Sequence, residues 1–297
     1  MTASGLPPSD IARRTGYVLT LSCADRVGIV HAVSGFLLDR QCNLVDSQQF
    51  VDRDKGAFFM RIQFEPSART KFDFGALRAD FYNVAVRFVM TWRLVDASAR
   101  QQALILVSKY GHCLNDLLFR ADTGELAIDV VAVVSNHPDM SALANNYEVP
   151  FYHVPVSEAT KPQAEQRLLE LIEIHGADLT VLARYMQVLS PDLCKRLEAR
   201  AINMQHSMLP SFKGARPYHQ AYDRGVKLIG ATAHYVTTDL DEGPIIEQEV
   251  RRVDHSMSAA EVTTLGRDNE CLALARAVRW HSENRILLDG HRTVIFK

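Results

Sequence analysis

The 297-residue sequence lacks paired cysteines, a strong charge of either sign and long apolar runs. Its five cysteines are scattered and include no C-x-x-C pair, which is typical of a reduced, cytoplasmic protein. The formal net charge of -2 argues against an electrostatic nucleic-acid partner. No apolar run approaches the roughly 18 residues of a membrane span, and the N-terminus has no signal-like apolar core. We therefore expect a soluble cytoplasmic protein with no nucleic-acid or membrane partner.

Several common catalytic signatures are also missing. There is no G-x-S-x-G nucleophile elbow and no Walker A loop, and Gly111 stands alone where a dinucleotide fingerprint needs three glycines. A metal site is a rival use of His206, His234 and Asp241, but no H-x-x-x-H, C-x-x-C or H-E-x-x-H spacing supports it. These absences favour a site with no metal ion and no tightly bound cofactor.

The first hundred residues alternate between strand-like and helical patterns after a flexible tail at residues 1–14. The expected elements, in chain order, are a strand at 16–23, a helix at 29–40, strands at 43–51 and 57–64, a helix at 72–89 and a strand at 90–95. The order βαββαβ is the ferredoxin-like split unit. We place this domain at residues 15–95 and a short polar linker at 96–102.

The remainder, residues 103–297, consists of short apolar runs separated by helical patterns. The runs lie at 103–107, 128–134, 150–155 and 179–183, and the helical patterns at 114–119, 140–147, 161–175 and 191–200. Continuous apolar strands between helices predict an α/β domain with a doubly wound, mostly parallel, Rossmann-like sheet covered on both faces. Ligands of such sheets bind at the carboxyl ends of the strands. An irregular strand-and-turn segment at 239–250 and a long helix at 259–281 end the domain.

The segment Leu182–Pro191 is the first of three that attract attention at the end of a predicted strand. It stays apolar through a turn before Pro191 starts a helix. An ordinary loop with apolar anchors would have this pattern. A slot that binds a flat heterocycle and has exposed backbone groups would have the same pattern.

Polar side chains form the second segment, where an apolar run beginning at Ala201 presents Asn203, Gln205, His206 and Ser207. A single histidine near a strand end is usually structural. A cluster of hydrogen-bonding groups at the carboxyl end of a strand is equally what a ligand site would need.

The third segment combines a strand-terminal His234 with an acidic turn. Asp239, Asp241 and Glu242 crowd this turn, which Gly243 and the following proline close. A solvated acidic turn is the common interpretation. The alternative is acid–base catalysis, since a carboxylate pair beside a histidine is suited to moving protons.

Together these segments resemble known families. Asn203-x-Gln-His-Ser-x-Leu-Pro-x-Phe-x-Gly214, Gly230-Ala-Thr-Ala-His234 and Asp239-Leu-Asp-Glu-Gly-Pro-Ile-Ile-Glu-Gln248 resemble the formyltransferase fold that uses 10-formyltetrahydrofolate. Residues 23–30 and 43–48 resemble an ACT domain. With residues 182–190 and 216–222, the combination resembles the formyltetrahydrofolate deformylase family over nearly the whole chain.

The resemblance implies hydrolysis of 10-formyltetrahydrofolate, as substrate, to formate and tetrahydrofolate, which would feed purine synthesis and balance one-carbon pools. The family's catalytic Asn, His and Asp fall on Asn203, Gln205 and Asp241, with a supporting histidine at His234. The pterin is expected against the following residues: Met186, Gln187, Val188, Leu189, Asp239, Leu240, Glu242 and Gly243. The ACT domain implies an amino-acid effector such as glycine or methionine, and a homo-oligomer.

Gln205 departs from the family pattern, which has two consecutive histidines here. Asn203 can donate to the developing oxyanion and Asp241 can deprotonate the attacking water. A glutamine amide also donates a hydrogen bond, but it cannot shuttle a proton to the leaving nitrogen. Losing such a group costs about 10²–10⁴ in rate. We do not expect His206 to replace it, because neighbouring side chains of an extended segment point to opposite faces.

The acceptor of the formyl group separates this family from the transferases that act on glycinamide ribonucleotide. Those enzymes bind the substrate phosphate with a Gly-Ser-Asn loop, which the stretch from Ser108 to Leu114 lacks. Water is therefore the favoured acceptor. Two alternatives stay open: a weakened paralogue that binds or senses folate, and a protein that acts on a different folate adduct or a different amine.

Overall fold

The computed structural model describes residues 15–67, 72–209 and 217–297, and the chain divides into two compact units. One unit takes in the chain up to Ala99 together with Phe296–Lys297, and the other runs from Arg100 to Ile295. The polar stretch 96–102 contains the last residue of β4 and the first two of β5, so residues 97–100 lie between the strands. The tail at 1–14 lies outside the described residues.

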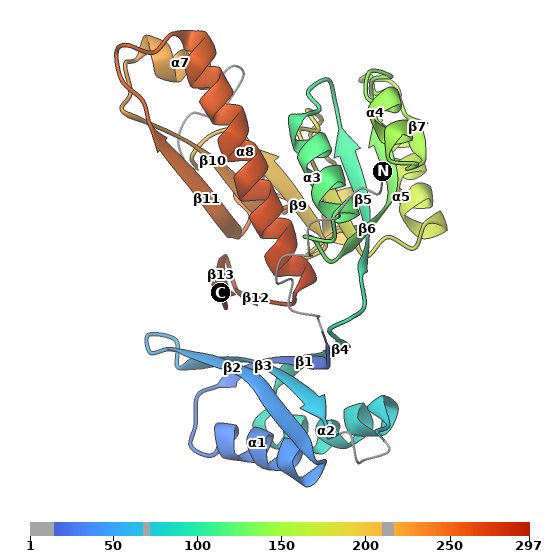
Figure 1. Cartoon of the computed structure of the whole chain (residues 1–297), viewed down its shortest axis with the longest axis vertical. Helices are drawn as coiled ribbons and strands as arrows, with labels where there is room; N and C mark the ends of the chain where they lie inside the picture. Colours follow the sequence, from blue (N-terminus) through green and yellow to red (C-terminus); the bar gives the residue numbers. More distant parts are fainter. Residues whose placement is uncertain (1–14, 68–71, 210–216) are drawn as a thin grey trace, which may run out of the picture. The chain divides into compact units, whose positions relative to one another are not determined.

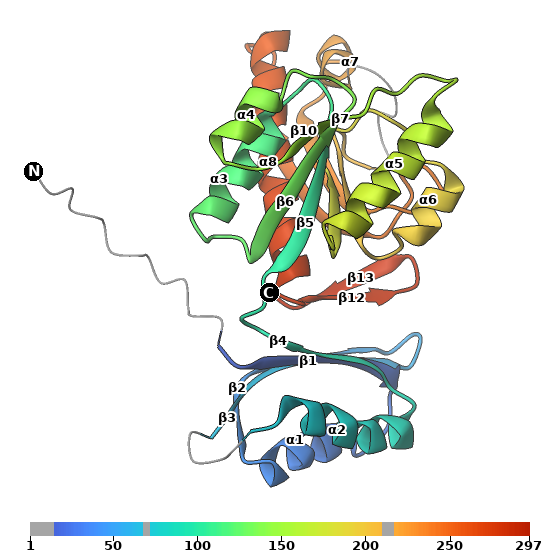
Figure 2. The same ribbon diagram turned by 90° about the vertical axis from the view of Figure 1, so that its right-hand side faces the viewer.

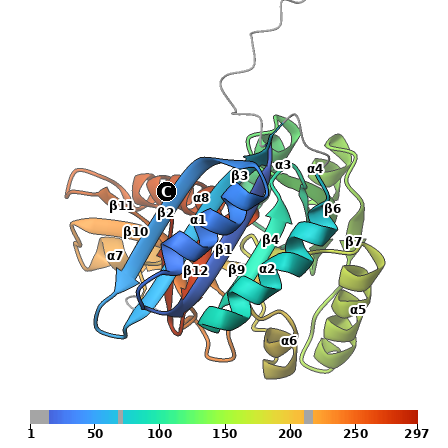
Figure 3. The same cartoon turned by 90° about the horizontal axis from the view of Figure 1, so that it is seen from below.

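The first unit is a βαββαβ sandwich of one sheet and two helices, as the pattern predicts. Its elements are β1 (Tyr17–Ala24), α1 (Ile29–Asp39), β2 (Cys42–Asp52), β3 (Ala57–Pro66), α2 (Phe74–Phe88) and β4 (Thr91–Asp96). The strands pair antiparallel in the order β2-β3-β1-β4. Figure 3 shows α1 and α2 side by side on one face of this sheet. Phe64 and Phe81 are fully buried between the two layers.

The second unit has a seven-stranded sheet in the order β11-β10-β9-β8-β5-β6-β7. The strands are β5 (Gln101–Val107), β6 (Ile128–Ser135), β7 (Phe151–His153), β8 (Leu179–Leu182), β9 (Ala201–Gln205), β10 (Leu228–Tyr235) and β11 (Ile245–Arg252). The helices are α3 (His112–Asp122), α4 (Ser141–Asn146), α5 (Lys161–Ile174), α6 (Pro191–Arg196), α7 (Pro217–Asp223) and α8 (Ala259–Ser282). A hairpin of β12 (Ile286–Asp289) and β13 (Arg292–Ile295) follows α8.

Helices cover both faces of the large sheet (Figures 1 and 2). On β5, Ala103 and Ile105 pack into the cluster formed with α3 and α8, whereas Leu104 and Leu106 pack into the cluster formed with α5 and α6. Because successive side chains of a strand point to opposite faces, both faces must be apolar, which explains the unbroken apolar runs. Within the described part of the chain, no helix is both long enough and apolar enough to cross a bilayer.

The sheet is mostly parallel, as expected, but one strand, β10, runs in the opposite direction. β10 runs antiparallel to both β9 and β11. The segment expected to be irregular at 239–250 is a turn followed by β11, which pairs with β10 across a bulge at Ala233/His234. This reversal decides how the polar segments meet.

Candidate active site

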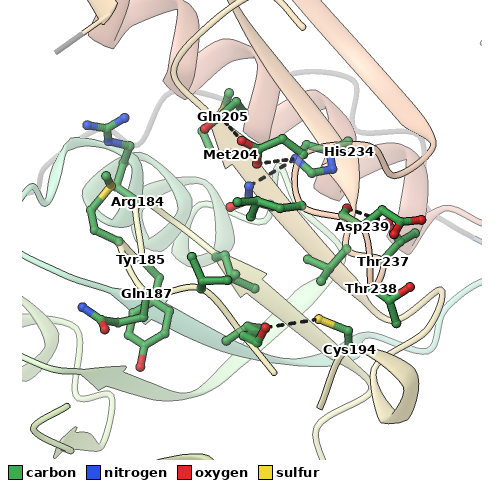
Figure 4. Close-up of a pocket in the computed structure, with 18 of the residues that line it drawn as sticks. Arg184, Tyr185, Gln187, Cys194, Met204, Gln205, His234, Thr237, Thr238 and Asp239 are labelled. Atoms are coloured by element: carbon green, nitrogen blue, oxygen red, sulfur yellow. Dashed lines mark hydrogen bonds and ion pairs between the residues drawn. The ribbon is translucent and has the colours of Figure 1, made fainter. Parts of the chain in front are cut away.

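The three segments singled out from the sequence line one pocket of about 280 Å³ (Figure 4). Its walls come from residues 184–189 after β8, residues 203–206 in and after β9, and residues 236–241 after β10, together with Leu182, Cys194 and His234. The predicted site residues on its wall are Asn203, Gln205, His234, Asp241, Met186, Gln187, Val188, Leu189, Asp239 and Leu240. Glu242 and Gly243, also expected against the pterin, are outside this lining.

Strand register brings the polar side chains to one face. Asn203 on β9 is paired with His234 on β10, and Gln205 is paired with Thr232. Residues directly opposite on antiparallel strands share a face, and so do residues two apart on one strand. Asn203, Gln205 and His234 therefore face the same side. They meet by cross-strand pairing and not, as the sequence suggested, because parallel strands end at a common edge.

His234 orients the amide of Asn203. Its Nδ1 lies 2.9 Å from the carbonyl oxygen of Tyr235, which can only accept, so the ring hydrogen is on Nδ1. Nε2 is then an acceptor, and the Asn203 Nδ2 donates to it over 3.1 Å. Burial lowers the pKa of His234, which favours this neutral form. One amide hydrogen of Asn203 is fixed, and the second can be donated to a ligand.

The Gln205 amide is bonded directly to the Asp241 carboxylate. Gln205 Nε2 donates to Asp241 Oδ2 over 2.5 Å, while Asp241 Oδ1 lies 4.0 Å from His234 Nε2. Asp241 has a φ of 58°, in the left-handed region that aspartate tolerates better than most residues. The turn thus presents one carboxylate oxygen to Gln205 and turns the other towards the His234 side of the pocket.

Two further contacts hold the apolar loop at residues 184–189, and neither was predicted from the sequence. The backbone N–H of Met186 donates to Ser108 Oγ over 3.0 Å, and Ser108 Oγ donates to Asn136 Oδ1 over 2.6 Å. At the other end of the loop, the Ser190 N–H donates to Glu165 Oε1 over 2.8 Å. Ser108 directly follows β5, and ligand sites of parallel sheets form at the carboxyl ends of strands. This position is the sequence feature that points to Ser108 as part of the site.

Potential metal ligands lie together away from the predicted set. The ligand atoms of His112, Cys113 and Glu270 are within 4.8 Å of one another. The Glu270 carboxylate is already engaged by His112, Tyr218 and Arg184. In the rival set proposed from the sequence, both ring nitrogens of His234 are engaged in hydrogen bonds. The Glu270 carboxylate and both ring nitrogens of His234 are therefore committed to protein partners.

Replacing Gly243 by alanine is expected to destabilise the site. An added Cβ would lie 1.7 Å from the Tyr235 carbonyl oxygen and 3.3 Å from His234 Nδ1, so the backbone must move. We expect a loss of about 1–3 kcal/mol in the free energy of unfolding, measured by denaturant titration. Gly35→Ala in α1 is the matched control, because nothing lies within 4 Å of its added Cβ. Equal free energies of unfolding for the two variants would contradict the close approach of Gly243 to the Tyr235 carbonyl oxygen.

The buried His234 is expected to make stability depend on pH. Its folded-state pKa is below the ordinary value of 6.5, so at lower pH the unfolded chain takes up a proton that the folded chain resists. The stability contributed by neutral His234 is fully present above pH 6.5 and is lost as pH falls towards the folded pKa. Denaturant titrations of the parent and His234→Gln at several pH values should show a stability difference that shrinks below pH 6.5. A difference that is constant or grows in that range would contradict the neutral tautomer.

Family models match both units of the chain. A model described as formyl transferase matches residues 101–278, and a model described as ACT domain matches residues 17–70. The fold and the site therefore define a protein of the formyltransferase class with an N-terminal ACT domain.

Full-length relatives make the assignment more specific. A formyltetrahydrofolate deformylase of Corynebacterium sp. (strain P-1) is 51% identical over 97% of this chain and 100% of its own length. The crystal structure of a Burkholderia mallei formyltetrahydrofolate deformylase is 52% identical, with a TM-score of 0.90 over 95% of this chain and 99% of that one. The chain belongs to the formyltetrahydrofolate deformylase family. A glycinamide ribonucleotide transformylase structure from Symbiobacterium toebii is more distant, at 27% identity and a TM-score of 0.63 over 67% of this chain and 95% of that one.

Proposed function

We propose that this protein hydrolyses 10-formyltetrahydrofolate to formate and tetrahydrofolate. The observation that carries the proposal is the convergence of the Asn203 amide, the Gln205 amide and the Asp241 carboxylate on one pocket with an apolar wall. A hydrogen-bond donor and a carboxylate base are the groups that water attack on a formamide requires.

Exposed apolar side chains suit the pocket to a flat heterocycle. Met186 and Val188 on one loop and Leu240 on the other are 52%, 54% and 60% exposed, and all three line the pocket. Large apolar side chains that are exposed at a pocket favour binding of a ligand that removes them from water. We assign the pterin to this wall, with the formyl group towards Asn203 and Asp241.

The chemistry needs one water molecule and no other reactant. Asp241 takes a proton from the water as its oxygen bonds to the formyl carbon. The free hydrogen of the Asn203 amide is donated to the oxygen that becomes negative, a preorganised contribution of the oxyanion-hole type. The bond from carbon to N10 then breaks, N10 takes up a proton, and formate and tetrahydrofolate leave.

Gln205 has a positioning role in this scheme. Its Nε2 holds Asp241 Oδ2, which leaves Oδ1 for the water. Because an amide is not an acid, Gln205 does not protonate N10, and the proton must come from water or from protonated Asp241. We infer turnover that is limited by protonation of the leaving nitrogen.

The function is tested by incubating the purified protein with 10-formyltetrahydrofolate and measuring formate and tetrahydrofolate. Hydrolysis predicts the two products in equal amounts. The competing function, a folate-binding or sensing protein with a weakened site, predicts binding by calorimetry without product. Binding without any formate would therefore refute the hydrolase.

A homo-oligomer is the second part of the proposal. β2 is an edge strand of 11 residues, and its Leu44, Val45 and Phe50 are exposed. Long apolar edge strands are a liability in a monomer and are covered when two copies pair. We expect light scattering at micromolar concentration to give a dimer or larger assembly, which a mass of 33.3 kDa would contradict.

A cytoplasmic location is the third part of the proposal, because five scattered cysteines are typical of a reduced compartment.

An amino-acid effector is the last part of the proposal. Gly28, with a φ of 96°, precedes α1, and no side chain in the described part of the chain caps this helix end. The N–H groups there are suited to the carboxylate of an effector such as glycine or methionine. Separate calorimetric titrations with glycine and with methionine test this proposal. The absence of binding heat in both titrations would count against it.

A further inference from the structure

We propose that Arg184 closes the pocket on its Gln205 side and thereby restricts the acceptor of the formyl group to water. The inference rests on the proposed hydrolase function and concerns the specificity of the same site. Its basis is a buried cluster around Glu270 that anchors the Arg184 guanidinium.

Arg184 forms part of the pocket wall, and its guanidinium is paired with the Glu270 carboxylate. The residue lines the pocket together with Gln205 and His206, and its side chain is 11% exposed. Figure 4 shows its guanidinium directed away from Tyr185 and Gln187, on the opposite side of the pocket from His234. Arg184 Nε lies 3.4 Å from Glu270 Oε2, an ion pair that is longer than a direct hydrogen bond. Arg184 thus lies between the pocket and the cluster.

Glu270 is a firm anchor for this guanidinium. Its side chain is 1% exposed, His112 Nε2 lies 2.7 Å from Oε2, and the Tyr218 hydroxyl donates to Oε1 over 2.8 Å. Burial raises the pKa of the Glu270 carboxyl group, but the combined effect of His112, Arg184 and Tyr218 is larger and lowers it. The net pKa is below the ordinary value, so the group is charged. A buried carboxylate held by three partners has one arrangement and resists displacement.

Two contacts fix the partners of Glu270. Tyr218 packs so closely on α8 that a Cβ at Gly266 would lie 2.2 Å from its ring. On the other side, the Arg184 guanidinium carbon lies 5.9 Å from the centroid of the Tyr110 ring. A cation–π contact at this distance is attractive. The wall is therefore continuous from α8 to the loop after β5.

A wall here decides which nucleophile reaches the formyl carbon. A related fold, the Symbiobacterium toebii structure, is named as a transformylase of glycinamide ribonucleotide, so the fold itself accommodates a large acceptor. In this chain Arg184 lines the pocket that Gln205 also lines, and its ion pair with Glu270 holds it there. Water is small enough to reach Asp241 regardless. An amine acceptor such as glycinamide is larger, and the wall limits its approach to the formyl carbon.

Opening the wall would permit transfer in place of hydrolysis. The nitrogen of an unprotonated amine would bond to the formyl carbon and lose its proton to Asp241. The bond from carbon to N10 would break, N10 would take up a proton, and a formamide and tetrahydrofolate would be released. No oxidant or further reactant is needed.

Arg184→Gly is the variant of choice, because Arg184 has a φ of 65° that glycine adopts without strain. The enzyme is given 10-formyltetrahydrofolate and a high concentration of glycinamide, and N-formylglycinamide and formate are measured by mass spectrometry. We expect the fraction of formyl groups on glycinamide to be at least about tenfold higher than in the parent. Arg267→Ala, which also removes an arginine from Tyr110 but not from the pocket wall, should keep the parent fraction.

Glu270→Gln provides an independent route to the same answer. It leaves Arg184 in place but removes the charge that anchors it, and the formyl fraction on glycinamide should rise again. If both variants, folded by circular dichroism, give formate alone, the wall does not set the acceptor. A rise with Arg267→Ala equal to that with Arg184→Gly would also overturn the proposal. If the parent itself releases no formate, the proposed function fails, which is a distinct result.

Discussion

Asp241→Asn is expected to lower the rate of formate release by about 10³-fold, within the 10²–10⁴ typical of a lost general base. The substitution is nearly isosteric, and an Asn oxygen can still accept the hydrogen bond from Gln205 Nε2. The turn should therefore keep its conformation, including the left-handed φ that asparagine also tolerates. The change then reports on the charge and basicity of Asp241.

The measurement is the initial rate of formate release at saturating 10-formyltetrahydrofolate. Asp223→Asn, an exposed acid at the end of α7, is the control for removing one negative charge. It should retain the parent rate. An Asp241→Asn rate within threefold of the parent would mean that Asp241 is not the base, and that water is activated elsewhere.

Gln205→His is expected to raise the rate of formate release by about 10²-fold, at the low end of the range for a positioned acid–base group. Gln205 is on the face that carries Asn203, and its amide already contacts Asp241. A histidine there would lie beside the carboxylate, which favours its protonated form, and could donate a proton to N10. His206 also lines the pocket, with its ring centroid 6.5 Å from that of Tyr218, but the contact with Asp241 is made by Gln205.

The control is Gln187→His, which adds a histidine to the same pocket on the opposite loop. It should give no gain. The Gln205→His rate should also show a new dependence on pH near neutrality, where a histidine titrates. No gain at any pH would mean that the pocket is organised around glutamine for another reaction, such as cleavage of a different folate adduct.

The fold was predictable wherever local pattern determines it. The unbroken apolar run of β5 follows from helices on both faces, and the apolar positions Met60, Ile62 and Phe64 of β3 follow from a helical layer on one face. The helix α7 was not predicted, although its seven residues are no fewer than those of α4 and α6, which were. The hairpin β12–β13 carries a sequence signal in Gly290, which lies in its two-residue loop and adopts a φ of 63°.

The site was predictable as three segments but not as contacts. Family motifs identify Asn203, Gln205 and Asp241, and all three line the pocket. Their partners depend on register, since the antiparallel direction of β10 brings His234 opposite Asn203. The hydrogen bond from Gln205 to Asp241 spans 36 residues, and no local pattern specifies it. The anchor at Glu270 directly follows the polar run Arg267–Asn269 of α8, so the sequence does not distinguish it from a surface residue.

Hydrolysis of 10-formyltetrahydrofolate in ¹⁸O-labelled water tests the central claim most directly. Attack of water on the formyl carbon places one oxygen from the solvent in each formate molecule, and Asp241→Asn should slow the appearance of this label in proportion to total formate. Mass spectrometry of the product distinguishes the outcomes. Formate with one ¹⁸O atom from the parent protein is the result we predict. Formate without the label, or no formate above the Asp241→Asn level, would contradict the account.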